Sequence, residues 1–147
     1  MTPKIISKIL PSLGLMFVLG SAITQVQEGT AAIPPAEQEP VITIRSTDNV
    51  SRGKTGSFVL DMKPALMLGG TYVNFSVGGT AVPGVDYAPL VSPAYIGQSG
   101  AGTILVQTLP DRRGSSSRQA YSVVVTLEPG PGYAIGIPNS ATMWIKP

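Results

Sequence analysis

From Val41 to the end of the chain, apolar and polar residues alternate in short runs. Six runs show this period of two: VITIR (41–45), GSFVLDM (56–62), TYVNFSV (71–77), TILVQTL (103–109), YSVVVTL (121–127) and ATMWI (141–145). Side chains of a β-strand point alternately to opposite faces, so each run predicts a strand with one apolar face. Segments rich in Gly, Pro, Asn and Ser separate the runs, as expected for turns. The pattern predicts an all-β fold over residues 41–147, an antiparallel β-sandwich of about seven strands.

The alternation also predicts which side chains share a face. In the run GSFVLDM, Phe58, Leu60 and Met62 lie on one side of the strand. In the last run, Met143 and Ile145 share a face and Trp144 points the other way. After residue 40, no segment shows the 3.6-residue period of an amphipathic helix.

The N-terminal region has the pattern of an export signal. Lys4 and Lys8 precede the apolar run Ile9–Gly20, and small residues follow at 21–22 and again at 30–32. This order is typical of a secretory signal peptide, which we place at residues 1–32. An uncleaved membrane anchor is the alternative, because residues 9–26 carry no formal charge, although a spanning helix usually needs about 20 apolar residues. Either reading places the domain outside the cytoplasm, whether secreted, periplasmic or at the cell surface.

The composition removes several functions. The 147 residues contain no His and no Cys, so zinc sites built on thiolate or imidazole and Ser-His-Asp nucleophile systems are excluded. The formal net charge is only +2, and no dense basic patch of the nucleic-acid-binding type is present. Residues 33–40 contain Pro and Glu and are expected to form an extended, exposed linker before the sandwich.

Three segments carry a family resemblance: VNFSVGGTAVPGVDY (73–87), GTILVQTLPD (102–111) and YSVVVTLEPGPGYAIGIPNSATMWI (121–145). They combine a Gly-Thr-Ala turn at Gly79, a Gly-x-Asp-Tyr corner at Gly84 and a strand that ends in Leu-x-Asp at Leu109. This combination resembles the Calx-beta domain. The resemblance implies an immunoglobulin-like sandwich that works as a binding or structural module.

The same resemblance implies a calcium site at one end of the sandwich, built from carboxylates of several loops. Asp86 and Asp111 stand at two of the implied positions, but Arg52 stands where a Glu is expected. The loop after Asp111 carries three further cations, Arg112, Arg113 and Arg118. Calcium takes six to eight oxygen ligands, so we interpret Asp86 and Asp111 as the remnant of a site in which arginines replaced the ion. No cofactor is expected, and calcium is possible only at this remnant.

Other candidates have weaker support. A glycosidase would need two carboxylates on either side of the bond that it cleaves. Beyond Pro40 the carboxylates are Asp48, Asp61, Asp86, Asp111 and Glu128, and most of them occupy turn or strand-edge positions. The loop DRRGSSSR (111–118) is either a solvated hairpin tip or a contact surface for an anionic partner, through Arg112, Arg113 and Arg118. Trp144 is either covered by the linker or exposed for a sugar or a protein partner.

Together these patterns predict an exported, non-enzymatic binding or structural module. Its expected partner is a protein or an anionic polysaccharide at the cell surface. We expect no nucleic acid, and membrane contact only through an uncleaved N-terminal segment. Two alternatives remain at this stage: a calcium-binding adhesion module in which backbone carbonyls replace the lost acids, and an unrecognised hydrolase.

Export gives the first testable prediction. Expression in a secreting host should yield a mature protein that begins at Ile23 or Ile33, because small residues precede both positions as signal peptidase requires. N-terminal sequencing of the exported material measures this directly. Recovery of the intact chain, beginning at Met1, from the cytosol would contradict it.

Overall fold

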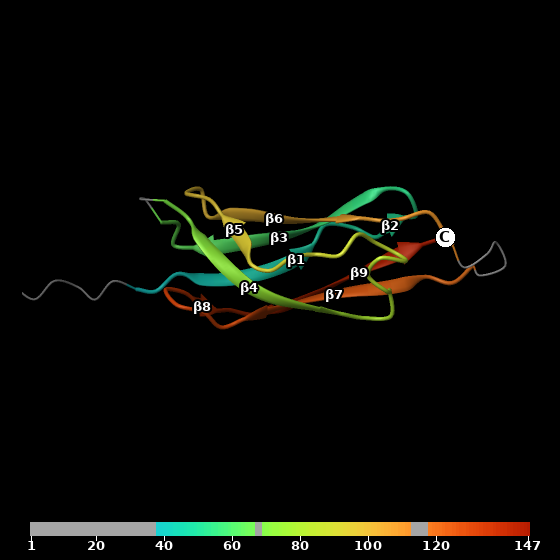
Figure 1. Cartoon of the computed structure of the whole chain (residues 1–147). Helices are drawn as coiled ribbons and strands as arrows, with labels where there is room; N and C mark the ends of the chain where they lie inside the picture. Colours follow the sequence, from blue (N-terminus) through green and yellow to red (C-terminus); the bar gives the residue numbers. More distant parts are fainter. Residues whose placement is uncertain (1–37, 67–68, 113–117) are drawn as a thin grey trace, which may run out of the picture. The chain divides into compact units, whose positions relative to one another are not determined.

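The computed structural model describes residues 38–66, 69–112 and 118–147. This part of the chain is all-β, without a helix (Figure 1). The predicted signal peptide at residues 1–32, and most of the predicted linker, lie outside the described residues. Consistent with the absence of helices, no described segment is a helix long and apolar enough to cross a membrane. Nine strands are present: β1 (Val41–Ser46), β2 (Val50–Ser51), β3 (Thr55–Lys63), β4 (Thr71–Gly78), β5 (Ala94–Ile96), β6 (Ala101–Gln107), β7 (Tyr121–Glu128), β8 (Ala134–Ile135) and β9 (Ser140–Lys146).

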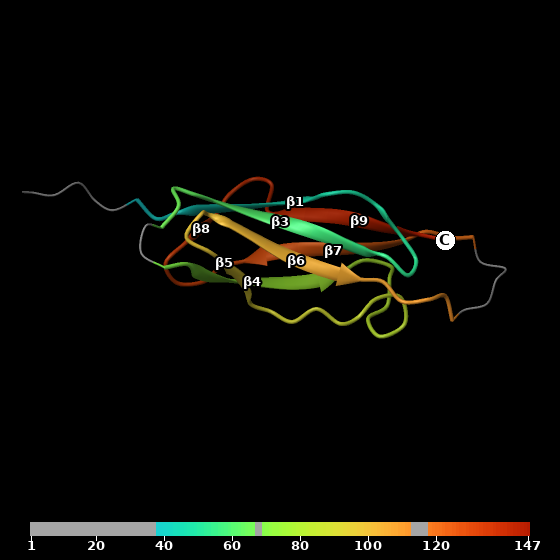
Figure 2. The ribbon, with the colours of Figure 1, turned by 90° about the horizontal axis from the view of Figure 1, so that it is seen from above.

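The strands form two layers that share one member, β4. Its first part, Thr71–Val73, pairs with β5, and its second part, Asn74–Gly78, pairs with β7. One layer therefore runs β4-β5-β6-β3-β1-β8 and the other runs β2-β9-β7-β4. Figures 1 and 2 show β4 passing from one layer to the other. Strands that change sheets in this way form the corners of a sandwich.

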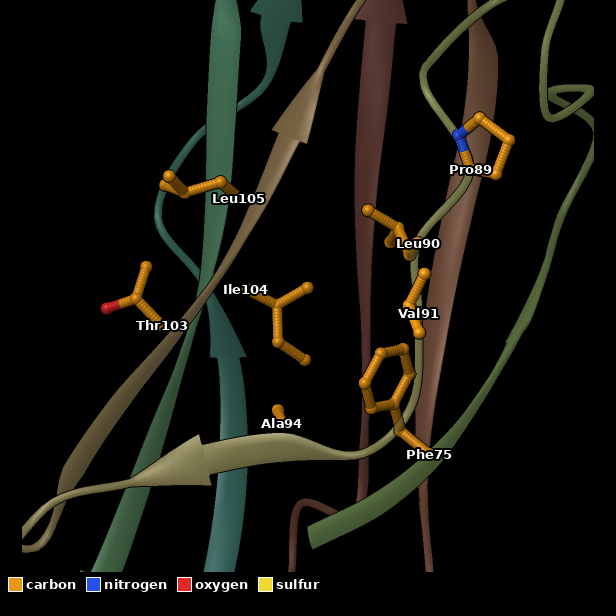
Figure 3. A pocket seen from close by; sticks show the side chains of 8 residues that line it. All are labelled: Phe75, Pro89, Leu90, Val91, Ala94, Thr103, Ile104 and Leu105. Carbon is orange, nitrogen blue, oxygen red and sulfur yellow. The ribbon is translucent and has the colours of Figure 1, made fainter. Parts of the chain in front are cut away.

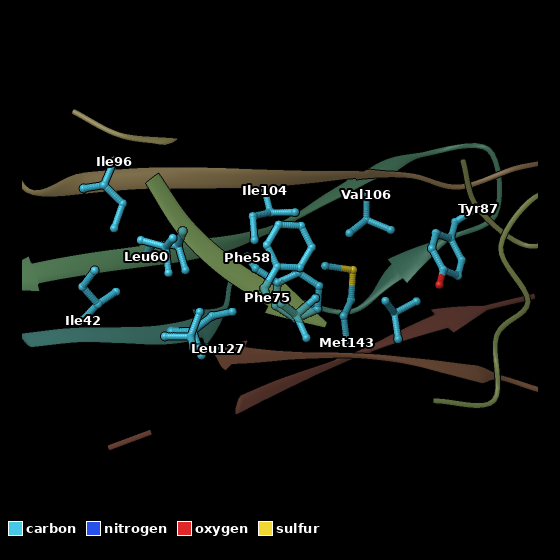
Figure 4. Packing of buried hydrophobic residues seen from close by; sticks show 14 of the residues in the cluster. Ile42, Phe58, Leu60, Phe75, Tyr87, Ile96, Ile104, Val106, Leu127 and Met143 are labelled. Carbon is cyan, nitrogen blue, oxygen red and sulfur yellow. The ribbon is translucent and has the colours of Figure 1, made fainter. Parts of the chain in front are cut away.

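The core lies between the layers and consists of the apolar faces that the alternation predicts. Phe58, Leu60 and Met62 are buried, as are Met143 and Ile145 (Figure 4). Burying an aliphatic or aromatic side chain of this size contributes roughly 1.5–3 kcal/mol relative to leaving it in water. The sandwich prediction and the facing of its main strands are thus confirmed.

Three strands have no counterpart in the sequence prediction: β2, β5 and β8. Each has only two or three residues, which is too short to display a period of two. The other six strands match the six runs of the sequence, and with the three-residue β5 the described residues contain seven strands of three or more residues, in agreement with the predicted number. Residues 97–100 connect β5 to β6 as a tight hairpin, in which the Gly100 N–H donates to the Gly97 carbonyl over 3.0 Å.

The turn that follows β4 is fixed to β7, and it positions the next loop. Gly79 has φ of +106°, a conformation that favours glycine, and a Cβ at this position would collide with the Ser122 backbone. The Ser122 N–H donates to Thr80 Oγ1 over 2.8 Å, and the Ala81 N–H donates to the Ser122 carbonyl over 2.9 Å. The chain therefore enters the 82–87 corner from a fixed direction.

Candidate functional site

Asp86 stabilises the 82–87 corner, which follows the turn after β4. Its main-chain N–H donates to the Val82 carbonyl over 2.8 Å, and its Oδ2 accepts the Val82 N–H over 2.7 Å. The Gly84 N–H donates to the Tyr87 carbonyl over 2.7 Å, which closes the corner from the other side. Asp86 is fully buried. An Asp that accepts local backbone N–H groups is a common turn device, and Asp86 has this role in the corner.

Arg52 reaches Asp86 from a different part of the chain, the turn between β2 and β3. Arg52 Nη2 lies 2.8 Å from Asp86 Oδ1, and only 9% of the Arg52 side chain is exposed. Arg52 Nε lies 4.0 Å from Asp111 Oδ2, and the guanidinium sits 5.5 Å from the ring centroid of Tyr121. One cation thus faces two carboxylates and an aromatic ring. Arg52 is hydrogen-bonded to Asp86 and lies at a longer distance from Asp111.

The turn that carries Arg52 is itself clamped. Thr108 is buried at the end of β6, and its hydroxyl lies 2.6 Å from the Lys54 carbonyl and 3.2 Å from the Ser51 carbonyl. The Arg52 N–H donates to the Lys146 carbonyl over 3.0 Å. The sequence analysis missed Thr108 and Tyr121, because a single threonine at a strand end and a single tyrosine at a strand start carry no distinguishing signal.

The electrostatics of this cluster oppose a metal ion. A guanidinium within hydrogen-bond distance neutralises a carboxylate through a charge-assisted bond. A divalent cation would have to displace Arg52 and then leave that arginine buried without an anion, which is strongly unfavourable. Across residues 38–66, 69–112 and 118–147, no group of three or more His, Cys, Asp or Glu could hold a metal ion.

One buried donor in the cluster stays unsatisfied. Arg52 Nη1 is buried and has no hydrogen-bond partner among the described residues. Leaving a buried donor unpaired costs about 1–3 kcal/mol, and more when the group is charged. The pair therefore gives little net stability, but it fixes which segments meet at this end of the sandwich.

Tyr87, next to Asp86, fills the end of the core (Figure 4). Only 1% of the residue is exposed. Burial raises the pKa of the Tyr87 phenol, and the nearby negative charge of Asp86 raises it further. Because the folded state holds this proton more tightly than the unfolded state, the associated stability is complete below the ordinary tyrosine pKa of about 10 and is lost as the pH rises above it.

The remaining predicted site residues lie apart from this buried cluster. Arg112 follows Asp111 directly and is exposed, and Arg118 is exposed just before β7; Arg113 lies outside the described residues. Neither Arg112 nor Arg118 forms an ion pair with another described side chain. Trp144 is 44% exposed on the outer face of β9, as the alternation predicts, and its main-chain N–H donates to Asn49 Oδ1 over 3.1 Å.

Comparisons with known proteins bear on the fold. No family model matches the chain, and no curated protein sequence is significantly similar to it. Among solved structures, the chain is similar to the crystal structure of CBD12 from CALX1.2, with a TM-score of 0.56 and 12% identity, over 72% of this chain and 44% of that chain. It is also similar to the crystal structure of the apo-form Calx CBD1 domain, with a TM-score of 0.52 and 13% identity, over 74% of this chain and 97% of that chain.

The fold is that of the Calx-beta domains. This agrees with the resemblance carried by the corner at Asp86 and the strand end at Asp111. The chain spans less than half of the CBD12 structure and corresponds in extent to the CBD1 domain.

The buried pair gives a prediction about stability. Arg52→Met keeps the length of the side chain and removes its charge, so Asp86 stays buried without its cation. We expect the free energy of unfolding to fall by about 3–5 kcal/mol, measured by urea denaturation. Arg52→Met combined with Asp86→Asn should lose less than Arg52→Met alone, because the fully buried charge is removed and only the partly exposed Asp111 loses its cation.

Arg45→Met is the matched control for this prediction. Arg45 also pairs with an aspartate, Asp61, at 3.3 Å, but the two side chains are 61% and 41% exposed. Exposed pairs contribute at most about 1 kcal/mol, so this variant should change stability little. Equal losses in Arg45→Met and Arg52→Met would refute the special role of the buried pair.

Metal independence gives a second prediction from the same cluster. Calcium at 1 mM should raise the melting temperature by less than about two degrees, measured by calorimetry. A micromolar site would stabilise the native state by about 4 kcal/mol at that concentration, which corresponds to several degrees for a domain of this size. A shift of that size that disappears in Asp86→Ala would show that calcium binds despite Arg52.

Proposed function

We propose that the chain is an exported, non-enzymatic binding module whose loop end binds an anionic partner, a protein face or an acidic polysaccharide. The fold supports this proposal, because a β-sandwich presents its connecting loops at its ends and contact surfaces concentrate on loops. Export rests on the sequence of residues 1–32 and is tested by the N-terminal sequencing described above.

The observation that carries the proposal is the uneven placement of charge along the sandwich. Of the seven Lys and Arg in the described residues, five belong to segments that meet at the end where Asp86 lies: Arg52, Lys54, Arg112, Arg118 and Lys146. The other two, Arg45 and Lys63, lie elsewhere on β1 and β3. Asp86 and Asp111 lie beside Arg52, and Asp48 lies in the loop before β2 at the same end. Five cations therefore meet three carboxylates, and an excess of positive charge remains at this end.

The exposed cations at this end are available to a partner, because the buried Arg52 pairs with the carboxylates beside it. Arg52 faces both Asp86 and Asp111, so these two carboxylates are engaged inside the domain. Lys54, Arg112, Arg118 and Lys146 are all exposed around them. A cluster of exposed cations attracts anions over roughly 8 Å at physiological ionic strength.

Retention on a heparin-like resin tests the proposal. The wild-type domain should bind at low salt and elute as the salt concentration rises, because exposed charges are screened. Arg112→Ser with Arg118→Ser should elute at clearly lower salt without loss of stability, since exposed loop positions contribute little to the core.

Arg45→Ser with Lys63→Ser is the charge-matched control, because it removes the same formal charge from other parts of the sandwich. It should elute close to the wild type. An equal shift in both double variants would show that only net charge matters. A wild type that passes through the resin at low salt would refute the proposal.

A further inference from the structure

A second surface lies on the side of the sandwich, where the pairing of β5 with β6 stops early. The two strands pair at Ile96 and Gly102. Followed from β5 back toward the N-terminus, the chain moves away from β6. It contacts β6 again only at Ala88, whose N–H donates to the Gln107 carbonyl over 2.9 Å. Between these two contacts is an opening of about 270 Å³ (Figure 3).

The opening reaches the core. Phe75 and Ile104 form its inner part, and both are almost fully buried. Leu90 and Ala94 line it from the loop and from β5, and Figure 3 shows Ile104 pointing into the space between β6 and the 89–91 segment. The residues that line the opening include no ionisable side chain, so the surface suits an uncharged, apolar group.

The main chain of Leu105 faces this opening. The carbonyls of Ala101 and Gln107 accept bonds from the side of β6 away from β3. Alternate residues of an antiparallel strand direct their main-chain groups to the same edge, so the N–H and C=O of Leu105 lie on that edge too. Continuing the register of Ile96 with Gly102 would bring Pro93 opposite Leu105. Proline has no N–H to donate, and no hydrogen bond from a described residue reaches the main chain of Leu105 across this gap.

The rim is apolar and exposed. Leu105 is 63% exposed and Val91 is 81% exposed. On the same sheet, Tyr72 of β4 and Tyr95 of β5 are 64% and 51% exposed, with ring centroids 5.1 Å apart. Exposed apolar residues gathered beside a pocket mark interaction sites more often than residues scattered singly.

We propose that this opening binds an extended segment of a partner protein, which pairs with Leu105 as a short added strand and inserts one apolar side chain over Ile104. The main-chain donor and acceptor of Leu105 select this occupant, since a peptide backbone matches both groups and an acyl chain matches neither. A sugar would find Thr103 as the one hydrogen-bonding side chain among the residues that line the opening. Strand addition to an exposed sheet edge is a general mode of peptide recognition.

The geometry defines the segment. The partner residue opposite Leu105 exchanges its N–H and C=O with Leu105, so its own side chain lies on the outer face. Its neighbours in the strand point to the inner face, toward Ile104 and Phe75. The segment is therefore uncharged, with an apolar residue directly beside the residue that pairs with Leu105. This site is separate from the cationic loop end and does not depend on it.

The test uses the ¹⁵N-labelled protein and a defined probe, the capped peptide acetyl-Leu-Thr-Leu-amide, which is short enough to fit between the contact of β5 with β6 and the contact of Ala88 with Gln107. Titration should shift the amide resonances of Leu105 and its neighbours in β6, and these shifts should saturate. The same peptide with an N-methyl group on its central threonine keeps every side chain but loses the N–H that Leu105 accepts. Its affinity should fall by about threefold to tenfold, the loss expected for one hydrogen bond.

Leu105→Pro provides the complementary change in the protein. It removes the N–H that faces the opening and leaves the bonds of β6 with β3, which use the alternate residues. Proline is tolerated at strand edges in this orientation. Leu105→Ala is the matched control, because it keeps the N–H and loses the side chain. Peptide binding should be lost in Leu105→Pro and retained in Leu105→Ala, with unchanged β6–β3 cross-peaks as the check on folding.

Three results would overturn the proposal. An absence of resonance shifts at millimolar peptide would show that the opening binds no strand. Equal affinity for the N-methylated peptide would show an apolar pocket without strand pairing. Shifts at Leu105 that grow with protein concentration, without peptide, would assign the opening to a second copy of this chain.

Discussion

The contact between Arg52 and Asp86 is the constraint on which the loop end depends. It joins the β2–β3 turn to the 82–87 corner inside the protein, where neither charge can be left alone. A buried ion pair of this kind contributes less to stability than to the choice of one arrangement over others. The same guanidinium also lies 4.0 Å from Asp111, so the strand end after β6 meets the other two segments at this one cation.

The change of pairing partner along β4 accounts for the opening on the side of the sandwich. Because β4 leaves β5 after Val73 and joins β7 from Asn74, the layers diverge there and the 89–93 segment has to cover the gap. Ser92 fixes this segment to β4, since the Phe75 N–H donates to Ser92 Oγ over 3.0 Å. The segment therefore follows β4 rather than β6, and the opening beside Leu105 results from that choice.

The sequence predicted the features that depend on local pattern. Alternation located six strands and the buried faces of Phe58, Leu60 and Met62, because period two is visible over five or more residues. The resemblance placed Asp86, Asp111 and Arg52 together. Tyr121, Thr108 and the free edge at Leu105 were not predictable in this way, because their roles depend on the register between segments distant in the chain. The strands β2, β5 and β8 were not predicted because they are too short to show a period of two.

The ends of the described domain have a mechanical consequence. The chain enters β1 at one end of the sandwich and leaves β9 at the other (Figure 1). Tension between Gln38 and Pro147 would therefore run along the strands, across hydrogen bonds that lie perpendicular to them. β1 is joined to β3 through six residue pairs, and β9 is joined to β7 through six. These bonds are loaded together in shear rather than opened one after another, which suits a domain held between two anchored points.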